Sequence, residues 1–460
     1  GISITDAFDN SRGIQIDNQS IQELQVISGT FNAEYGNAMS GIVNTVTKEG
    51  GREFHGGVMI YGGDHVSTFT DYFPHIDRVD IIGKRNLQAN LSGPVPYTGN
   101  TLNFFVNGRY YYDNGYLFGE RRYNVDGTPG DGAIVPMNWQ KNLYGQGNLS
   151  FVPTPGIKVN LEGLYSREHF QDYDHAFRWA PDGNLQKFGR SYTATASLTH
   201  MLSPSAFYTV KGSYFRRSFR EYLYQDPFDP RYQHPDSLLT VSYAFRTKGT
   251  NLHRFFRVTR TAVGKADFTS QVTQSHLLKM GAEVKIHSLD FDDFTLEPLQ
   301  VAGVPVEPFK TSIPAADQPN RDRYSNEPFE TSAYVQDKIE FESVIINIGV
   351  RFDYFDSRGK VLVDVTDPNI YTPLRPELEQ LSLVEREPYF YKKAKPKVQI
   401  SPRFGIAYPI SDAGVIHFSY GHFLQIPPFQ YLFNRGPYKV PQTGLNLGVW
   451  GNPDLEPQKT

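Results

Sequence analysis

The sequence predicts an all-β fold, a transmembrane antiparallel β-barrel, and three observations support it: the composition, a two-residue periodicity and the lengths of the connections. The 460 residues include 40 Gly, 29 Tyr and 33 Phe, but only 5 Met. Aromatic residues make up 14% of a chain whose mean hydropathy is −0.46, so large rings are scattered through polar sequence. No stretch approaches the roughly 18 uncharged apolar residues of a membrane-spanning helix. The chain is therefore either soluble or meets lipid as a β-barrel.

Apolar and polar side chains alternate with a period of two over long segments. In residues 278–286 every even position is apolar, while Glu283 and Lys285 occupy odd positions. The same alternation recurs at 158–165 and 344–354. The expected strands run about 10 to 14 residues, where a usual globular strand has about five or six. Long two-faced strands are typical of a tilted membrane crossing, although a large antiparallel sandwich with one solvated face is the alternative on this evidence alone.

The connections between the expected strands alternate between short and long. About thirteen strands are expected, at 54–62, 84–93, 101–112, 139–152, 156–168, 189–202, 204–224, 253–268, 275–289, 327–341, 343–356, 398–409 and 414–424. Short turns fall at 153–156, 203–205, 342 and 411–413, between longer segments at 113–138, 169–188, 225–252, 290–326, 357–397 and from 425 onward. An outer-membrane barrel sorts its connections in this way, because its periplasmic turns are short and its extracellular loops are long. The connections therefore favour the barrel over the sandwich.

Charge, cysteine content and motifs exclude several classes of protein. Lys and Arg total 45 and Asp and Glu total 49, which gives a formal charge of −4 instead of the basic excess of a nucleic-acid binder. The absence of Cys excludes a thiol nucleophile, thiolate metal sites and disulfides. The sequence has no Ser-centred nucleophile elbow, His-Glu-x-x-His pair or phosphate-binding loop. We therefore expect no nucleic-acid partner, no enzymatic activity, no cofactor and no metal.

One expected extracellular loop carries histidines among carboxylates and rings. The candidate ligand contacts in it are His169, Asp172, Tyr173, His175 and Trp179. Histidines near carboxylates can bind metals, and aromatic side chains can clamp peptides or sugars. A strand-end aromatic girdle with hydrogen-bonded histidines is the preferred interpretation of this segment.

Two further loops supply candidate ligand contacts. An acidic loop at 290–297 and an aromatic, Pro-containing loop at 426–441 contribute Asp292, Asp293, Phe429 and Tyr431. The acidic loop has oxygen ligands that suit Ca²⁺, but it lacks the glycine and terminal glutamate of an EF-hand. A solvated acidic loop is therefore the preferred interpretation of that segment.

The first fifty residues differ from the rest, because long strands begin only after Arg52. One short strand-like run is expected at 20–29, and residues 30–51 are rich in Gly and small side chains. Two motifs stand out in this segment. The first is a strand that runs into a glycine, with Ile21, Glu23, Leu24, Val26 and Gly29. The second is a closing pattern of Tyr-Gly, Gly-Val-Asn and Thr-Lys, with Tyr35, Gly36, Gly41, Val43, Asn44, Thr47 and Lys48. In these residues the segment resembles the end of the plug domain of TonB-dependent outer-membrane receptors.

Further motifs support this resemblance along the chain. The form FNAEYG, with Glu34, resembles Oar-like receptors that carry a carboxypeptidase-regulatory-like domain upstream. Three barrel segments are similar to family strands: SAYVQDKIEF from Ser332 with NIGVRFDYF from Asn347, SPRFGIAYPI from Ser401, and GNPDLEPQKT from Gly451. Ser28 departs from the pattern, because many siderophore receptors have Arg there, and a plug-to-barrel salt bridge from that Arg is not expected.

The resemblance implies how the chain is organised. Residues 1–51 would be the C-terminal part of a plug inside the lumen, with Glu34, Tyr35, Gly36, Gly41, Asn44, Thr47 and Lys48 as structural or gating residues. Residues 52–460 would be the N-terminal and central part of a barrel that closes with 22 strands in this family. Because about thirteen strands are visible, the resemblance implies an internal fragment of a longer receptor, without its C-terminal strands, signal peptide or TonB box.

The resemblance also implies a function. It predicts TonB-dependent active transport across the outer membrane of a Gram-negative bacterium, with TonB, outer-membrane lipid and an unknown substrate as partners. The Oar-like form suggests a peptide or protein substrate, and a surface lipoprotein is a candidate partner. The alternative is a barrel without transport that acts as a structural, docking or secretion-associated component.

Overall fold

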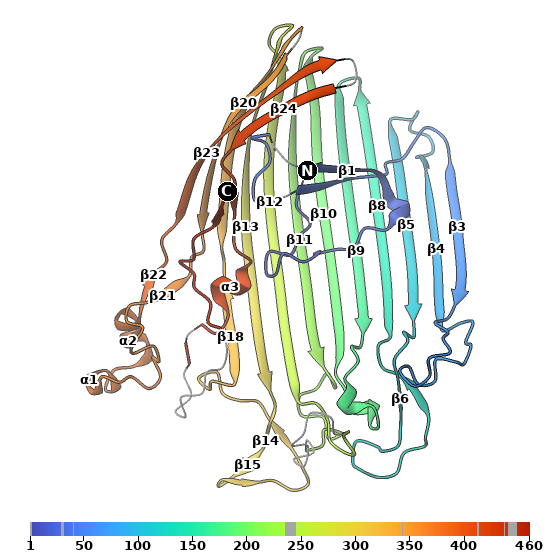
Figure 1. The fold of residues 1–460 in the computed structure, drawn as a ribbon, viewed down its shortest axis with the longest axis vertical. Helices are drawn as coiled ribbons and strands as arrows, with labels where there is room; N and C mark the ends of the chain where they lie inside the picture. Colours follow the sequence, from blue (N-terminus) through green and yellow to red (C-terminus); the bar gives the residue numbers. More distant parts are fainter. Residues whose placement is uncertain are drawn as a thin grey trace.

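The computed structural model describes residues 2–28, 32–39, 41–234, 245–342, 344–411, 414–436, 438–439 and 449–460. In this part of the chain the main sheet has fourteen antiparallel strands: the short β18 (Arg321–Asn326), which pairs with one of the others off the main path, and thirteen long strands whose order in the sheet is their order in the chain (Figure 1). The long strands are β3 (His55–Gly63), β4 (Lys84–Pro94), β5 (Leu102–Asp113), β8 (Gln140–Thr154), β9 (Ile157–Phe170), β10 (Gln186–Ser203), β11 (Ala206–Tyr222), β12 (His253–Gln271), β13 (His276–Thr295), β19 (Phe329–Phe341), β20 (Val344–Asp356), β23 (Lys397–Ser411) and β24 (Gly414–Gly421). The predicted all-β antiparallel fold and strand number are confirmed. Within the described residues, β3 and β24 are the edges of the sheet and do not pair with each other.

Short turns lie at one end of the sheet and long connections at the other, which is the lower end in Figure 1. The long connections carry short elements: β6 (Phe118–Glu120), β7 (Ile134–Pro136), η2 (His175–Phe177), η3 (Pro181–Gly183), β14 (Glu297–Pro298), β15 (Gln300–Val301), β16 (Val304–Pro305), β17 (Thr311–Ser312), β18 (Arg321–Asn326), β21 (Lys360–Leu362), α1 (Pro376–Glu379), α2 (Leu383–Phe390), β22 (Tyr391–Lys393), β25 (Leu424–Gln425), α3 (Phe429–Phe433) and β26 (Gln458–Lys459). The predicted alternation of short and long connections is confirmed. The connection at 225–252 and the turn at 411–413 lie partly outside the described residues, and Gly29 lies wholly outside them.

The two faces of the strands follow the predicted alternation. Val284 and Ile286 are 40% and 51% exposed on the outer face, whereas the Glu283 and Lys285 side chains are 17% and 16% exposed on the other. Residues directly opposite in a ladder share a face, and Ile286 lies opposite Ala262 on β12. Because the register is continuous across the main sheet, the inner or outer face of each side chain follows from these pairs.

The N-terminal residues cross the inner face of the sheet (Figure 1). They include η1 (Asn18–Ser20) and β1 (Ile21–Ser28), which pairs with β2 (Gly41–Thr47) in a separate two-stranded sheet. The sequence predicted a single strand here and glycine-rich irregular chain after it, so β2 is a correction. Its small residues obscured the alternation, but pairing with β1 satisfies its backbone.

An apolar cluster joins the N-terminal residues to the sheet. Phe8 packs with Leu289 and Phe291 of β13, with Phe355 of β20 and with α3, which folds back against the inner face. In the described part of the chain, no helix combines the length and apolar character needed to cross a membrane.

Candidate functional site

The first contact between the N-terminal residues and the sheet is an ion-pair cluster. Asp6 is fully buried, 3.1 Å from a terminal nitrogen of Arg257 and 3.8 Å from Nε of Arg217. The other Arg257 nitrogen lies 3.1 Å from Asp9, and the guanidinium lies 4.2 Å from the ring centre of Phe8. One inner-face arginine therefore holds two carboxylates and a ring from residues 6–9.

A tight backbone loop at residues 6–11 holds the carboxylates of Asp6 and Asp9 toward Arg257. The amide of Asp6 donates to the Ser11 carbonyl, and the amide of Asn10 donates to the Asp6 carbonyl, which closes a tight loop. Burial by itself raises the pKa of Asp9, but hydrogen bonds from Ser11 and the charge of Arg257 outweigh it and hold that pKa below its usual value of 3.8. The loop therefore stabilises the charged form of Asp9 next to Arg257.

A second acidic residue docks the chain further along. The Asp17 carboxylate lies 3.2 Å from Arg109 on β5 and accepts a hydrogen bond from Gln88 on β4. Asn107 donates to the Ser20 hydroxyl at 2.8 Å. The sequence analysis did not single out Asp6, Asp9 or Asp17, because their partners lie about 70 to 250 positions away in the chain.

Residues 32–36 meet the sheet differently. Arg351 of β20 points at the carbonyls of Ala33 and Glu34 at 3.4 and 3.5 Å. Arg403 of β23 points at the Tyr35 carbonyl at 3.4 Å. These contacts are longer than the 3.1–3.2 Å pairs that Arg257 and Arg109 make with aspartates, and they involve carbonyls instead of carboxylates, so they hold this part of the segment less firmly.

The predicted plug-motif residues have separate roles. A Cβ at Gly36 would lie 2.4 Å from the Arg351 guanidinium, whereas at Gly41 the nearest atom would be the Ile27 carbonyl at 3.5 Å. Gly36 is therefore a close-approach position. Gly41 is not, because a Cβ there would make only ordinary van der Waals contact.

The remaining motif residues lie along β2 and just after it. Thr47 donates to Glu162 of β9 at 2.6 Å, and Asn44 lies opposite Gln25 in the β1–β2 pair. The amide of Lys48 donates to the Ser20 carbonyl. The Glu34 carboxylate is 3.7 Å from Lys279. Thr47 and Glu34 therefore contact the sheet through their side chains, whereas the recorded contacts of Asn44 and Lys48 are made by backbone.

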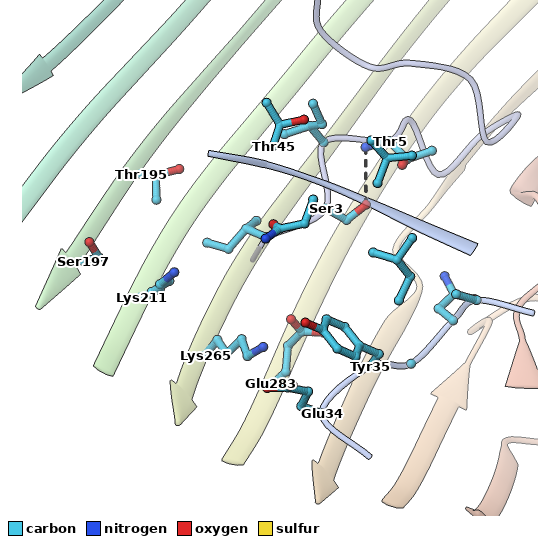
Figure 2. Close-up of a pocket in the computed structure, with 18 of the residues that line it drawn as sticks. Ser3, Thr5, Glu34, Tyr35, Thr45, Thr195, Ser197, Lys211, Lys265 and Glu283 are labelled. Carbon is cyan, nitrogen blue, oxygen red and sulfur yellow. Dashed lines mark hydrogen bonds between the residues drawn. The ribbon is translucent and has the colours of Figure 1, made fainter. Parts of the chain in front are cut away.

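A cavity of about 600 Å³ separates β2 from the inner face (Figure 2). Its walls carry Glu34, Tyr35, Thr45, Thr47, Thr195, Ser197, Lys211, Lys265 and Glu283. Both cations and carboxylates line the space, and hydroxyls lie between them. Such a lining suits water and charged solutes instead of an apolar core.

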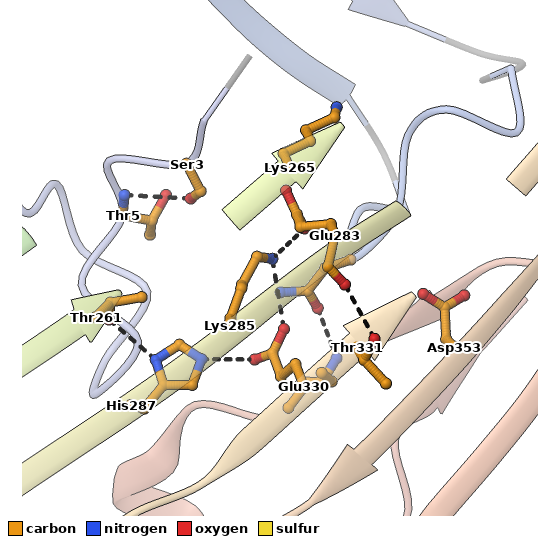
Figure 3. Close-up of polar contacts among 12 residues, drawn as sticks. Ser3, Thr5, Thr261, Lys265, Glu283, Lys285, His287, Glu330, Thr331 and Asp353 are labelled. Carbon is orange, nitrogen blue, oxygen red and sulfur yellow. Dashed lines mark hydrogen bonds and ion pairs between the residues drawn. The ribbon is translucent and has the colours of Figure 1, made fainter. Parts of the chain in front are cut away.

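A polar cluster borders this cavity on β13 and β19 (Figure 3). Lys285 lies 3.0 Å from Glu283 and 3.4 Å from Glu330, and His287 lies 3.1 Å from Glu330. The other ring nitrogen of His287 lies 2.9 Å from the Thr261 hydroxyl. Each charge has an opposite partner, so the cluster stabilises the inner face and offers no unpaired nucleophile.

The structure brings together three of the predicted extracellular residues. The Tyr173 hydroxyl lies 2.7 Å from Nδ1 of His175, and both His175 and Trp179 stand beside Phe245, with ring centres 5.0 and 4.3 Å away. His169 instead belongs to β9 and stacks on Phe188 on the outer face at 4.4 Å. The predicted set therefore splits, because β9 continues to Phe170.

Asp172 is separate from both of these groups. Its carboxylate lies 2.7 Å from Lys187, which it shares with Glu221. No group of three or more His, Asp or Glu among the residues that the structure describes is arranged to hold a metal ion.

The predicted acidic loop at 290–297 is mostly strand, because β13 extends to Thr295. Asp292 and Asp293 therefore point to opposite faces. Asp292 makes a bidentate pair with Arg321 at 2.7 and 2.9 Å, and Asp293 lies 2.7 Å from His253. Because they point to opposite faces, Asp292 and Asp293 cannot bind the same Ca²⁺ ion.

The predicted aromatic loop at 426–441 is also partly corrected, because it contains α3. Phe429 is only 1% exposed and packs at 5.0 Å edge-on to His287, inside the apolar cluster. Tyr431 on the same helix is 53% exposed. Of this pair, Tyr431 is accessible to a ligand and Phe429 is a packing residue.

Comparison with known proteins identifies the fold family. The family model "TonB dependent receptor-like, beta-barrel" matches residues 80–460. The chain belongs to this family. It is therefore an outer-membrane β-barrel of the TonB-dependent receptor type, a family of receptors and transporters.

Solved structures give the same fold at low sequence identity. The siderophore receptor PirA of Acinetobacter baumannii has 15% identity and a TM-score of 0.58, with 100% of this chain and 58% of that chain covered. A mutant of the ferric enterobactin receptor PfeA of Pseudomonas aeruginosa has 15% identity and a TM-score of 0.56, with 94% and 54% covered. The copper transporter OprC has 12% identity and a TM-score of 0.59, with 100% and 58% covered. The chain thus spans little more than half the length of these structures, and no curated protein matches it.

Proposed function

We propose that residues 1–51 are the C-terminal part of a plug and that residues 52–460 form part of the barrel of a TonB-dependent transporter. The observation that supports this most strongly is the position of the described N-terminal residues, 2–28, 32–39 and 41–50, across the inner face next to a polar cavity of about 600 Å³. The part of this segment after residue 32 contacts the sheet through ion pairs and hydrogen bonds, so it can shift without breaking the apolar cluster around Phe8. In this proposal TonB supplies the force and the receptor transports substrate across the outer membrane.

The proposed moving part is the segment from residue 32 to residue 49. Its contacts to Arg351 and Arg403 are long and end on carbonyls, and the cavity lies directly beside it. Glu34, Tyr35, Gly36, Gly41, Asn44, Thr47 and Lys48 belong to this segment. Widening of the cavity by displacement of β2 would open a passage along the cations and carboxylates of its walls.

The substrate is proposed to be a peptide or protein. Support comes from the Oar-like FNAEYG form and from the side chains of Tyr173, His175, Trp179 and Phe245, which group on the side of the long connections. Rings of this kind contact peptide side chains through large apolar areas with polar edges. A size-fractionated peptide pool should quench the Trp179 component of the purified receptor's fluorescence, taken as the difference between the wild type and Trp179→Phe, and a ferric siderophore should not. The reverse result would contradict this substrate class.

The transport proposal is tested without knowledge of the substrate by labelling a cysteine in the cavity. Ser197 lines the cavity, and because these 460 residues contain no Cys, Ser197→Cys gives a single thiol within them. We expect a membrane-impermeant maleimide to label it several-fold faster in energised cells with TonB than in cells without TonB. Lys248→Cys on an exposed connection is the matched control and should label at one rate in both strains.

Equal labelling of Ser197→Cys in both strains would contradict transport. It would favour the alternative, a barrel that retains a fixed segment and acts in docking or as a structural or secretion-associated component. In that case a surface lipoprotein or another envelope protein would be sought as the partner.

A further inference from the structure

A group of cations covers the outer face of four adjacent strands, β8 to β11, near the ends that lead to the long connections. These are Lys141, Arg167, Arg190, Arg216 and Arg220, and we refer to them as the basic belt. All but Arg216, which is half-buried, are exposed. The family fold and the short turns at the opposite end place this belt on the extracellular side of the barrel.

The register places the belt residues on one face. Arg167 lies directly opposite Arg190, and Arg190 lies directly opposite Ser218 on the next strand. Arg216 and Arg220 flank Ser218 along β11, two residues to either side. The arginines therefore surround one point, across three strands spaced about 4.8 Å apart, or roughly 10 Å in all.

The acidic residues of the same four strands all lie on the opposite face. Glu162 accepts a hydrogen bond from Thr47, Glu221 pairs with Lys187, and Glu168 faces Gly189 on the inner face. Within the described residues, no ion pair or hydrogen bond is recorded for the side chains of Arg167, Arg190, Arg216 or Arg220. Protein carboxylates therefore do not neutralise the basic belt.

On the next strand, an outer-face arginine has a carboxylate partner, unlike the arginines of the belt in the described part of the chain. Arg260 on β12 lies directly opposite Arg216, yet it pairs with Asp290 at 2.6 Å. By contrast, Arg167 and Arg190 face each other with no carboxylate between them. Like charges directly opposite in a sheet destabilise it, so this arrangement indicates an anion supplied from outside the chain.

The belt lies at the border of the lipid-facing band. Between the belt and the short turns, the outer face of β10 and β11 carries the directly opposite pairs Ala194–Tyr214, Ala196–Gly212 and Leu198–Val210. The pair His200–Tyr208 closes this band near the short turns. Tyr208 and Arg216 are eight residues apart, or about 26 Å along the strand. At a barrel-strand tilt of about 40° this spans about 20 Å in height, a few ångströms less than the roughly 25 Å of a barrel's apolar band.

Aromatic rings accompany the cations at this level. Phe188 lies between His169 and Tyr222, with ring centres 4.4 and 4.7 Å away, on the same outer face. Rings with polar edges settle at the headgroup region of a membrane. The basic belt therefore stands at headgroup depth in the outer leaflet.

We propose that the basic belt binds a phosphorylated lipid of the outer leaflet, with lipid phosphates bridging Arg167, Arg190 and the two arginines that flank Ser218. Guanidinium groups bind phosphate oxygens in a bidentate manner, which suits several arginines around one site. The acyl chains of the lipid would lie along Ala194, Ala196, Gly212, Leu198 and Val210, which extend from the belt toward the short turns. This site is independent of the transport proposal, because it lies on the face opposite the cavity.

The test uses the complete receptor extracted from outer membranes, freed of lipid in detergent and titrated with purified bisphosphorylated lipid A. Native mass spectrometry measures the bound fraction. The belt variant combines Arg167→Gln, Arg190→Gln, Arg216→Gln and Arg220→Gln. We expect its affinity for the lipid to fall at least tenfold. The matched control removes four exposed cations from the long connections and should bind like the wild type: Lys248→Gln, Lys310→Gln, Lys392→Gln and Lys393→Gln.

A second variant separates lipid binding from folding. Arg167→Glu places a carboxylate opposite Arg190, so the pair becomes attractive and the thermal midpoint should stay the same or rise. The lipid should nevertheless be lost from this variant. Unchanged lipid affinity in both Arg167→Glu and the fourfold variant would overturn the proposal.

Two further arms identify the source of the phosphate. Dephosphorylated lipid should bind at least tenfold more weakly than lipid A, and equal binding would show that only the apolar surface matters, against the proposal. Inorganic phosphate alone should not raise the thermal midpoint. A rise equal to that given by lipid A would assign the belt to a free anion and overturn the lipid assignment.

Discussion

Arg257 and Arg220 stand on neighbouring strands, β12 and β11, but on opposite faces of the sheet. On the inner face, Arg257 is buried between Asp6 and Asp9, with the Phe8 ring against its guanidinium. On the outer face, Arg220 is exposed opposite Phe188, and no carboxylate partner is recorded for it within the described residues. The chain thus supplies carboxylates to Arg257 on the inner face and, among the described residues, none to Arg220 on the outer face.

This difference shows how one sheet serves two environments. Arg109, Arg257 and Lys285 on the inner face are paired with carboxylates, because they are enclosed with the N-terminal segment, where an unpaired charge is costly. Outer-face charges are confined to headgroup depth, where lipid can supply the counter-charge. If the comparison is right, substitutions on the inner face should disturb docking of residues 2–50, and substitutions on the outer face should disturb the contact with lipid.

The largest effect is expected for Arg257→Ala. Removal of this guanidinium leaves Asp6 buried with only Arg217, at 3.8 Å, which should cost about 3–5 kcal/mol in the free energy of unfolding. Hydrogen exchange of the amides at residues 5–12 should increase strongly in the same variant. Arg220→Ala in detergent is the control and should change stability by no more than about 0.5 kcal/mol. Equal losses in both variants would remove the distinction between the faces.

The next effect concerns the apolar band. Val284→Arg places a charge toward lipid and should cost about 2–4 kcal/mol near the membrane midplane. Glu283→Gln on the adjacent inner position should cost much less, because its carboxylate borders the polar cavity and Lys285 keeps Glu330 as a partner. Denaturant unfolding of the receptor in lipid vesicles measures both. A larger loss for Glu283→Gln would mean that the faces are assigned in reverse.

The sequence predicted those parts of the fold that depend on local pattern. The thirteen strands and the outward direction of Val284 and Ile286 follow from a period of two, because a register error of one residue would reverse every side chain. The extension of β13 through Asp290 and Asp292 did not follow, since DFDD resembles a loop until Arg260 and Arg321 supply partners. Partners this far apart in sequence cannot be paired from one chain.

Of the candidate site, the sequence predicted the motif segment but not the residues that attach it to the sheet. The plug-like motif located the segment near Gly36 and Thr47, because its glycines and small residues form a recognisable pattern. The anchor at Asp6, Asp9 and Asp17 was missed, although three aspartates ahead of a glycine-rich segment were a visible signal. The inward fold of α3, which buries Phe429, depends on packing against Phe8 and was not readable from its aromatic sequence.

A smaller effect should separate the two motif glycines. Gly36→Val pushes a side chain into Arg351, which is also held by Asp353 at 2.8 Å, and should cost about 1–3 kcal/mol. Gly41→Val meets only ordinary contact distances and should cost less than about 1 kcal/mol. Thermal unfolding in detergent measures the difference. Equal destabilisation would show that residues 32–36 are not held close to Arg351 as the structure indicates.

The smallest effect is a dependence on pH at the anchor. The pKa of Asp9 is held below 3.8 in the folded state by Ser11 and Arg257, which offset the effect of burial. A carboxylate with a lowered pKa stabilises the fold above its unfolded pKa, and this contribution is lost as the pH falls through 4 and below. Because Asp9 is partly exposed, we expect less than about 1 kcal/mol. Asp9→Asn should therefore lower the thermal midpoint at pH 7, and its difference from the wild type should shrink as the pH falls below 4. Asp71→Asn on an exposed connection should match the wild type throughout. A constant difference between Asp9→Asn and the wild type from pH 7 to pH 3 would show that the charge of Asp9 does not contribute to docking, and that the anchor rests on Asp6 and Arg257 alone.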